Sequence, residues 1–253
     1  MYGKPGKLGI FGGCFNPIHK GHILIAEKAA EEFGLDQVLF VPNPNPPHKE
    51  APGMPSPDIQ ARMTARAIAG NPRFGLSVYE LRRQYDCFTW NTLMHFREKY
   101  PEDELYFIMG ADSLRDFPTW KKPAVISSFA VLCVACRDEL IDEGLQELAR
   151  RRAREYHADI RLISCPQAEI SSTRLREMIM EGKKEADRWL PAGVGDIIRE
   201  NGLYRPPEDP AAEPDTDERI PQADHCRPDG PAAETDQGAQ DTPMQENERA
   251  DAG

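Results

Sequence analysis

Two closely spaced histidines in a glycine-rich segment are the residues of this chain best suited to chemistry. The segment spans residues 12–22 and reads G-G-C-F-N-P-I-H-K-G-H. Histidine supplies hydrogen-bond donors that are neutral or charged near pH 7, and small residues let a ligand approach the backbone. We therefore predict a phosphate-binding site here. Its candidate residues are Gly12, Gly13, Cys14, Phe15, His19, Gly21 and His22.

The elements around this segment place it where anions bind. An apolar stretch at 8–11 predicts a buried strand, and apolar side chains then repeat at helical spacing from Ile23 to Phe33, where Gly34 offers a stop. At a helix entrance, unpaired N–H groups and the positive end of the helix dipole favour anions. The segment fits neither a P-loop nor the G-x-G-x-x-G pattern. A metal site stays as an alternative, although no Asp, Glu or Cys stands at ligand spacing from the histidines.

A second segment, at 170–176, reads I-S-S-T-R-L-R. Its hydroxyl residues Ser171, Ser172 and Thr173 can cap a following helix, whose buried face repeats at helical spacing. Arg176 lies just inside that helix and carries a planar donor fork that suits phosphate. The alternative is a plain N-cap with a surface arginine.

Together the two segments resemble the signature motifs of the nucleotidyltransferase superfamily, in which H-x-G-H holds the phosphates of ATP. The second segment is similar to the I-S-S-T-x-x-R motif of the nicotinate-nucleotide adenylyltransferase family, and the resemblance covers roughly residues 7–204. It implies catalytic roles for His19, His22 and Arg176. The residues that it implies for ATP binding are Gly12, Gly13, Cys14, Phe15, Gly21, Lys49, Asp112, Ser171, Ser172 and Thr173.

Further stretches match the same family in order. The proline-rich loop 43–49 contributes Asn43 to the substrate site and Lys49 as a phosphate contact. Residues 80–82 and 87–93 are similar to the family's E-L-x-R and S-Y-T-x-x-T-L segments, which assigns Phe88 and Thr89 to the substrate site. Thr89 at a helix start suits the carboxylate that separates nicotinate from nicotinamide, although from the sequence alone it equally well only caps that helix.

The stretch from 110 to 121 resembles the family's G-x-D and tryptophan pair. Asp112 follows a predicted strand, where open α/β sheets bind ligands, and suits a ribose hydroxyl. Trp120 offers a flat face for stacking on a pyridine ring, a contact worth on the order of 1 kcal/mol, or serves as a core residue.

The chain departs from the family at three positions. Cys14 stands where threonine is commonest, Asn16 where aspartate is usual, and Phe88 where tyrosine is expected. The first two departures change the side-chain oxygen contacts available at those positions, while backbone N–H contacts remain. The third removes a tyrosine hydroxyl.

The predicted elements alternate along the chain. Strands are expected near 7–11, 37–41, 74–78, 104–109, 130–134 and 159–163, and helices near 20–33, 58–69, 90–99, 141–155, 172–181 and 192–200. This alternation predicts an α/β fold with a parallel sheet covered on both faces. The resemblance adds a doubly wound, Rossmann-like arrangement with the active cleft at the carboxyl ends of the strands. Residues 1–205 are expected to form this one nucleotidyltransferase domain.

The net charge of −11 comes from residues 206–253, which hold 14 Asp and Glu against 3 Arg, together with eight prolines. Since this acidic, proline-rich tail has almost no large apolar residues, we predict that it is disordered. Residues 1–205 show no basic excess for nucleic acid. The chain has no run of about 18 apolar residues for membrane insertion and no apolar N-terminal region for secretion.

The scattered cysteines indicate reduced thiols and hence a cytoplasmic protein. Cys133 and Cys136 form a C-x-x-C within a predicted strand, where side chains three apart face opposite sides, so a zinc or redox role is weakly supported.

The resemblance implies transfer of the adenylyl group of ATP, carried with Mg²⁺, to nicotinate mononucleotide. This reaction releases pyrophosphate and forms nicotinate adenine dinucleotide in NAD biosynthesis. The alternatives are another phosphate acceptor, such as nicotinamide mononucleotide or pantetheine phosphate, or a nucleotide-binding regulator without turnover. The oligomeric state is left open, a homo-oligomer included.

Overall fold

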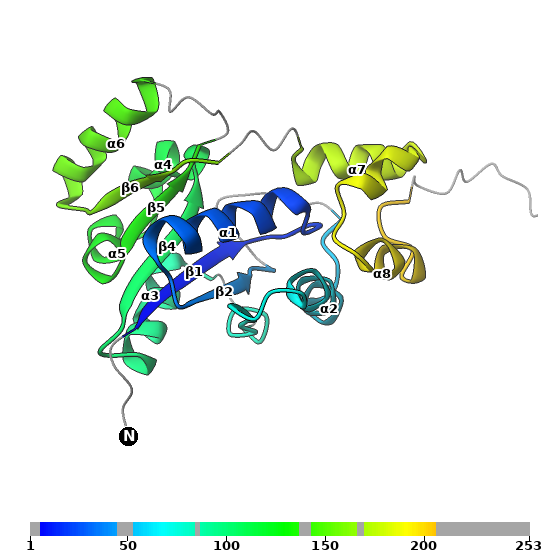
Figure 1. The fold of residues 1–253 in the computed structure, drawn as a ribbon, viewed down its shortest axis with the longest axis horizontal. Coiled ribbons are helices and arrows are strands. Elements are labelled where there is room, and N and C mark those ends of the chain that lie inside the picture. Colours follow the sequence, from blue (N-terminus) through cyan, green and yellow to red (C-terminus); the bar gives the residue numbers. More distant parts are fainter. Residues whose placement is uncertain (1–5, 45–52, 84–86, 137–142, 166–169, 206–253) are drawn as a thin grey trace, which may run out of the picture. The chain divides into compact units, whose positions relative to one another are not determined.

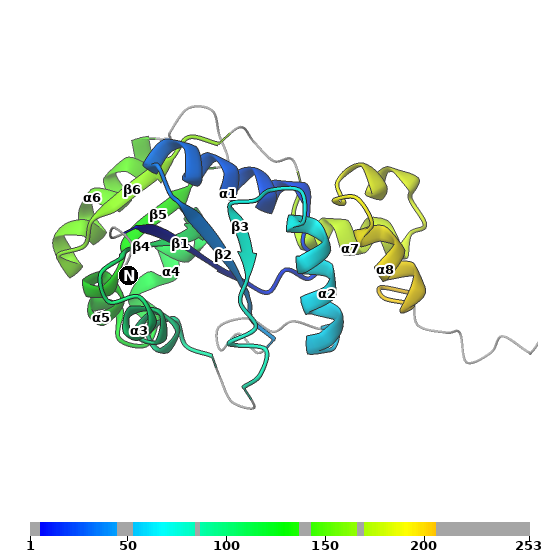
Figure 2. The same ribbon diagram turned by 60° about the horizontal axis from the view of Figure 1, so that its bottom comes forward.

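Six parallel strands form one sheet in the order β3-β2-β1-β4-β5-β6 (Figures 1 and 2). The computed structural model describes residues 6–44, 53–83, 87–136, 143–165 and 170–205. The strands are β1 (Lys7–Gly13), β2 (Gln37–Pro42), β3 (Phe74–Leu76), β4 (Glu104–Gly110), β5 (Val131–Ala135) and β6 (Ile160–Ile163). The strand order reverses between the neighbours β1 and β4, which is the point where doubly wound sheets bind ligands. The predicted fold is confirmed.

Helices cover both faces of the sheet (Figures 1 and 2). One core takes buried side chains from α1 (Lys20–Phe33), α2 (Pro57–Ile68), α7 (Ser172–Met180) and α8 (Val194–Glu200). The other takes them from α3 (Thr89–Lys99), α4 (Ala111–Asp116), α5 (Pro123–Phe129) and α6 (Glu143–Tyr156). Two short 3₁₀ helices are η1 (Phe117–Thr119) and η2 (Lys184–Arg188). Within the described ranges, no helix is both long and apolar enough to cross a bilayer.

The strands are buried on both faces, and successive side chains enter opposite cores. In β4, Tyr106 and Ile108 pack into the core of α1, whereas Phe107 packs into the core of α4. Such strands are near-continuous apolar runs, as expected for a parallel sheet. The same alternation separates Cys133 from Cys136, which lie in different cores, so their predicted opposite orientation is confirmed. None of the five described cysteines is in a disulfide.

The predicted boundaries are close to those observed, although two short helices, α4 and α5, are absent from the predicted set. Helix α1 ends as predicted at Gly34, whose φ of 64° is the left-handed conformation that glycine adopts without strain. Helix α5 has only seven residues and begins at Pro123, directly after Lys122 in the left-handed conformation. So short an apolar run has no helical period to recognise, because it spans only two turns.

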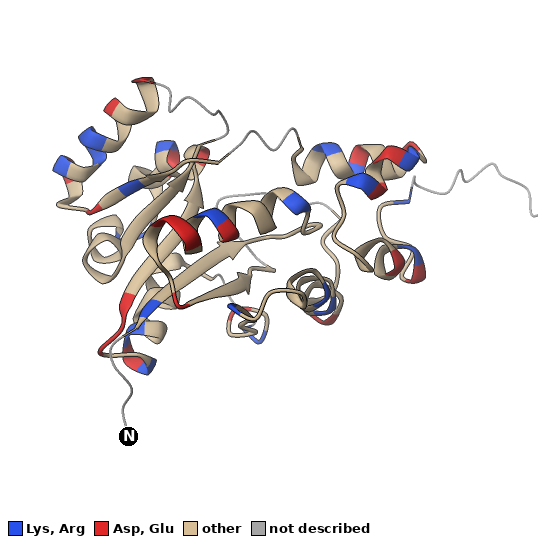
Figure 3. Ribbon diagram, in the orientation of Figure 1, with Lys and Arg blue, Asp and Glu red and all other residues tan. Residues whose placement is uncertain are grey.

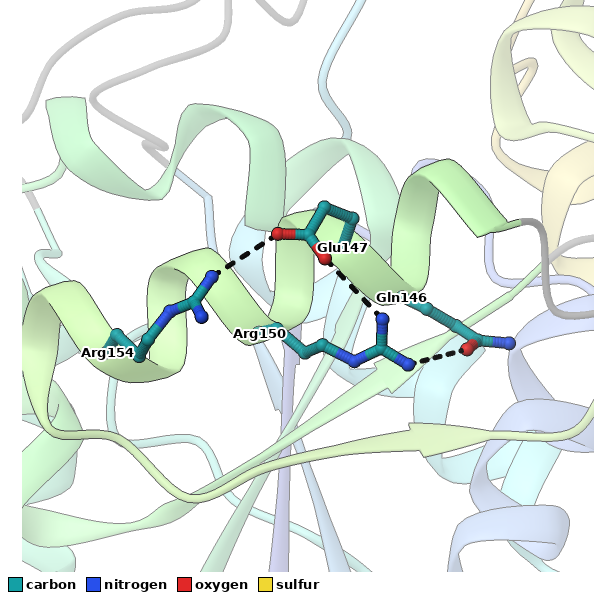
Figure 4. Close-up of polar contacts among 4 residues, drawn as sticks. All are labelled: Gln146, Glu147, Arg150 and Arg154. Atoms are coloured by element: carbon teal, nitrogen blue, oxygen red, sulfur yellow. Dashed lines mark hydrogen bonds and ion pairs between the residues drawn. The ribbon is translucent and has the colours of Figure 1, made fainter.

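Charged residues lie mainly on the helices and at strand ends (Figure 3). On α6, Glu147 pairs with Arg150 at 3.5 Å and with Arg154 at 3.3 Å, and Arg150 also donates to Gln146 (Figure 4). These exposed pairs contribute little to stability because water screens them. Arg152 on the same helix is buried and donates to the carbonyl of Arg115, which ties α6 to α4.

A buried carboxyl fastens the segment between β3 and α3. Glu80 is 4% exposed and its Oε1 accepts a 2.5 Å hydrogen bond from the hydroxyl of Thr92 in α3. Its carbonyl accepts from the Cys87 thiol at 3.6 Å. Burial raises the pKa of Glu80 to about 7, against the smaller lowering effects of the Thr92 hydrogen bond and the Arg83 charge.

The end of the described chain returns to the loop after β1. The Tyr204 hydroxyl donates to Oδ1 of Asn16 at 2.5 Å, across 188 residues of sequence. Burial raises the pKa of this tyrosine well above its usual range. The predicted tail lies outside the described residues, so its disorder stays a prediction.

Replacing Glu80 with glutamine is expected to change how stability depends on pH. The pKa of Glu80 is about 7 in the folded chain against an ordinary 4.5, so the folded state binds more protons between these values. Stability is therefore lost as pH rises from 4.5 to 7, by on the order of 3 kcal/mol. Glu80→Gln removes this loss. In urea unfolding, the free energy of unfolding of the variant relative to the wild type should be higher at pH 8 than at pH 5. An equal pH response would contradict a buried carboxyl with a raised pKa.

Tyr204→Phe should destabilise the fold by about 1–3 kcal/mol, because it leaves the buried Oδ1 of Asn16 without its donor. The free energy of unfolding in urea measures this effect. Tyr100→Phe is the matched control, since no hydrogen bond of that hydroxyl occurs within the described ranges, and it should cost less than about 0.5 kcal/mol. Equal costs for the two variants would show that the Asn16 contact is unimportant.

Candidate active site

The glycine-rich loop leaves β1 with little room for side chains. A Cβ on Gly13 would lie 3.1 Å from the ring of Phe15, which is 2% exposed and has a φ of 45°. Left-handed backbone at a bulky residue persists only where the surroundings hold it. The ring of Phe15 meets Phe11 at 5.4 Å and His22 at 5.1 Å between centroids, both edge-on. The core thus determines the path of the loop and the position of His22.

The two histidines contact each other at the start of α1. His19 is the N-cap residue, and its backbone N–H donates to Nδ1 of His22 at 3.2 Å. Their rings lie 3.8 Å apart between centroids. Because Nδ1 of His22 accepts this bond, the proton of the neutral ring is on Nε2. His22 is thereby prepared to donate a hydrogen bond to an anion at the helix entrance.

The start of α7 lies directly against the loop after β1. Arg176 donates through Nη1 to the carbonyl of Asn16 at 2.7 Å, and the hydroxyl of Ser172 donates to the carbonyl of Pro17 at 3.0 Å. Ser171 is the N-cap residue of α7, and its hydroxyl accepts from the backbone N–H of Arg174 at 3.2 Å. The two motifs, about 160 residues apart in the sequence, therefore form one site with two helix entrances.

A cavity of about 360 Å³ opens between these two motifs. Every described residue assigned above to catalysis or ATP binding lines it, whereas Lys49 lies outside the described residues. Sequence reasoning assigned no role to several further lining residues, some inside the recognised motifs and some outside them. They include Asn16, Ile25, Gly110, Ser113, Cys136, Cys165 and Ile170.

A second, smaller cavity of about 170 Å³ adjoins the first. It is lined by the four residues assigned above to the substrate site, Asn43, Phe88, Thr89 and Trp120. The missed residues are Glu80, Cys87, Thr92, Phe107, Asp116, Lys121 and Ile126. Some of these residues are neighbours in sequence of a recognised site residue, but only the fold shows that they line the cavity. The residues that line both cavities are Gly12, Gly13, Cys14, Asp112 and Ser113.

The walls of the smaller cavity combine aromatic rings with a helix entrance. Trp120 packs on Phe107 at 6.2 Å and on Phe117 at 5.6 Å between centroids, so it serves the core as well as the cavity. Thr89 is the first residue of α3, whereas Phe88 occupies the N-cap position, and no described side chain caps this helix. Lys121 lies 4.4 Å over the ring of Phe88 and brings a positive charge to the same wall.

At two of the three positions where this chain differs from the family, the residue makes a structural contact. The side-chain oxygen of Asn16 accepts from Tyr204, and the carbonyl of Cys14 accepts from the side-chain amide of Gln60. Asn43 donates to the carbonyl of Cys87 at 3.3 Å and links the two sides of the smaller cavity. Across the described ranges, no three His, Cys, Asp or Glu side chains gather in a group that could hold a metal ion.

Comparison with known proteins agrees with this geometry. The family model described as cytidylyltransferase-like matches residues 10–178. A probable nicotinate-nucleotide adenylyltransferase of Trichlorobacter lovleyi is 40% identical over 214 residues, covering 79% of this chain and all of the relative. Another, of Lachnoclostridium phytofermentans, is 35% identical over 198 residues, covering 78% of this chain and 98% of the relative.

A solved structure has the same fold. Nicotinic acid mononucleotide adenylyltransferase of Plasmodium falciparum, complexed with NaAD, aligns with a TM-score of 0.64 at 18% identity, covering 79% of this chain and 97% of that one. The bacterial relatives share more than a third of their residues with this chain over nearly their whole length. The chain therefore belongs to the nicotinate-nucleotide adenylyltransferase family of cytidylyltransferase-like proteins.

Proposed function

We propose that this protein transfers the adenylyl group of ATP to nicotinate mononucleotide, which releases pyrophosphate and forms nicotinate adenine dinucleotide. The observation that carries the proposal is the pair of adjoining cavities. The larger is lined by the two phosphate motifs, the smaller by aromatic rings, and five residues belong to both. Two ligands bound side by side would meet at this shared wall, as transfer between them requires.

The proposed transfer requires alignment and charge neutralisation more than a base. The phosphate of the mononucleotide is already a nucleophile and attacks the α-phosphorus of ATP, and negative charge builds on the departing pyrophosphate. His22 through Nε2, Arg176 through its guanidinium, and the entrances of α1 and α7 supply donors for this charge. His19 supports His22 from the N-cap position.

Mg²⁺ enters this proposal with ATP. In nucleotide sites the ion binds substrate phosphates and one or two carboxylates, and keeps several waters. Asp112 lines both cavities and offers one carboxylate, either to the ion or to a ribose hydroxyl. Its ion pair with Arg115, at 2.6 Å between exposed side chains, is weak enough to exchange for such a contact.

The start of α3 favours a carboxylate over a carboxamide on the pyridine ring of the acceptor. Phe88 and Thr89, at the start of this helix with its positive dipole end, line the smaller cavity, and Lys121 adds a cation there. A carboxylate gains from both, whereas a neutral carboxamide gains little. Trp120 supports stacking of the ring.

Pyrophosphate release with ATP and Mg²⁺ is expected to be much faster with nicotinate mononucleotide than with nicotinamide mononucleotide. Thr89→Pro tests the reason, because proline is tolerated at the first helical position yet lacks the N–H. We expect it to raise KM for the acid about tenfold or more, since a hydrogen bond to a charged group is worth about 1.5–3 kcal/mol.

Thr89→Ala is the matched control for this change and should leave KM for the acid nearly unchanged, because it keeps the N–H. Turnover with neither mononucleotide would refute the proposed acceptor and favour another phosphate acceptor or a nucleotide sensor.

His22→Ala should lower kcat by about 10²–10³ with little change in KM for ATP, because its donor acts on charge that develops only in the transition state. Steady-state kinetics with varied ATP measures this split. His157→Asn is the control, since His157 is exposed, lies outside both cavities and has a φ of 50° that asparagine also tolerates. Unchanged turnover in His22→Ala would rule out the assigned role.

A further inference from the structure

The wall of the smaller cavity includes buried side chains, and one of them is a carboxyl. Glu80, Thr92 and Ile126 line this cavity although they are 4%, 3% and 0% exposed. Their low exposure shows that they lie deep in the wall of the cavity. A negative charge placed in this cavity therefore lies near the Glu80 carboxyl.

The Glu80 carboxyl is only half satisfied. Its Oε1 accepts from the Thr92 hydroxyl, whereas its buried Oε2 has no hydrogen-bond partner among the described residues. A buried carboxylate oxygen without a donor is costly, so such an atom calls for an explanation. A proton on Oε2 removes the charge of this unsatisfied acceptor and so lowers the cost of burying it.

Burial, rather than a neighbouring charge, dominates the pKa of Glu80. Arg83, three residues along, is the charged group that lowers the pKa of Glu80, and burial outweighs it to raise that pKa to about 7. Other titratable groups of the cavity come from the loop after β1, from the segment before α3, from α4 and from the residue after Trp120. They are Cys14, Cys87, Asp112, Asp116 and Lys121.

We propose that Glu80 takes up a proton when the pyridine carboxylate of the substrate enters this cavity, and so determines how strongly the acid is preferred over the amide. The proposal rests on the proposed function. Two carboxylates in a space with little water cannot both stay ionised, so the second negative charge drives protonation of the first. The proton comes from solvent and neutralises Glu80. A neutral carboxamide adds no charge and drives no uptake.

The consequence is a preference that depends on pH. Below the pKa of Glu80, the carboxyl is already neutral and the acid binds without proton uptake. Above it, each molecule of acid that binds must also bring a proton to Glu80, so the affinity falls by up to tenfold per pH unit. The affinity for the amide lacks this dependence, and the ratio of the two affinities therefore falls as pH rises past 7.

The test is calorimetric titration of the full chain with nicotinate mononucleotide and nicotinamide mononucleotide at pH 7.5, in two buffers of different ionisation enthalpy. The difference in heat between buffers counts the protons taken up on binding. The two ligands share the same phosphate, so its contribution cancels when they are compared. We expect the acid to take up about half a proton or more in excess of the amide.

Three variants separate this role from a structural one. Glu80→Gln keeps an acceptor for the Thr92 hydroxyl but cannot titrate, and the excess uptake should vanish. Asp116→Asn removes an exposed carboxyl of the same cavity, and the excess should remain. Thr92→Val removes a hydrogen bond that lowers the pKa of Glu80, so the pH midpoint of the acid affinity should move upward.

Binding of the acid without excess uptake would overturn the role of Glu80 and leave the proposed function intact. The same holds if Glu80→Gln keeps the excess. Absence of binding by both mononucleotides would overturn the proposed function and this assignment together. Should Glu80→Gln fold poorly, an unchanged midpoint in Thr92→Val would still refute the proposal.

Discussion

The contact between the start of α7 and the loop after β1 is the interaction on which the site depends. Arg176 and Ser172 donate to two consecutive carbonyls of that loop, at 2.7 Å and 3.0 Å. Each helix entrance alone offers only a weak anion site, because its few N–H groups and partial charge are screened by water. The parallel sheet brings α1 and α7 to one end of β1, and these hydrogen bonds direct both entrances at the same cavity.

The loop side chains are largely engaged in holding the loop itself. Phe15 is packed in the core, Asn16 accepts from Tyr204, and the carbonyl of Cys14 is held by Gln60. This arrangement explains how the chain accommodates residues that differ from the usual ones of its family. If the backbone N–H groups and the histidines hold the phosphates, a cysteine or an asparagine in the loop need only preserve its path.

The two cavities differ in their electrostatics. The larger has two helix entrances, two histidines and an arginine, which together favour negative charge. The smaller combines a helix entrance and Lys121 with the buried Glu80. An ionised Glu80 would repel a substrate carboxylate in this cavity, and burial lessens that repulsion by raising the pKa of Glu80 to about 7, which favours its neutral form. The same burial links Glu80 to α3 through Thr92, so one residue affects both the fold and the cavity.

Local patterns in the sequence determined the elements and the motifs. The strands are apolar runs and the longer helices carry an apolar face at regular spacing, so their positions follow from side-chain hydrophobicity alone. The segments 12–22 and 170–176 each predict a helix entrance, because the residues that form such an entrance are neighbours in the chain. Helix α5 was not predicted, because its seven residues are too few to show a helical period.

Only the tertiary structure decided which side chains share a cavity. Glu80, Thr92 and Ile126 belong to three separate segments, and their meeting at one inner wall depends on how α3 and α5 pack against the sheet. The raised pKa of Glu80 is likewise a consequence of burial, which no residue pattern encodes. The engagement of Asn16 by Tyr204 joins residues 188 positions apart. Composition and spacing describe neighbours along the chain, whereas desolvation and hydrogen-bond satisfaction depend on neighbours in space.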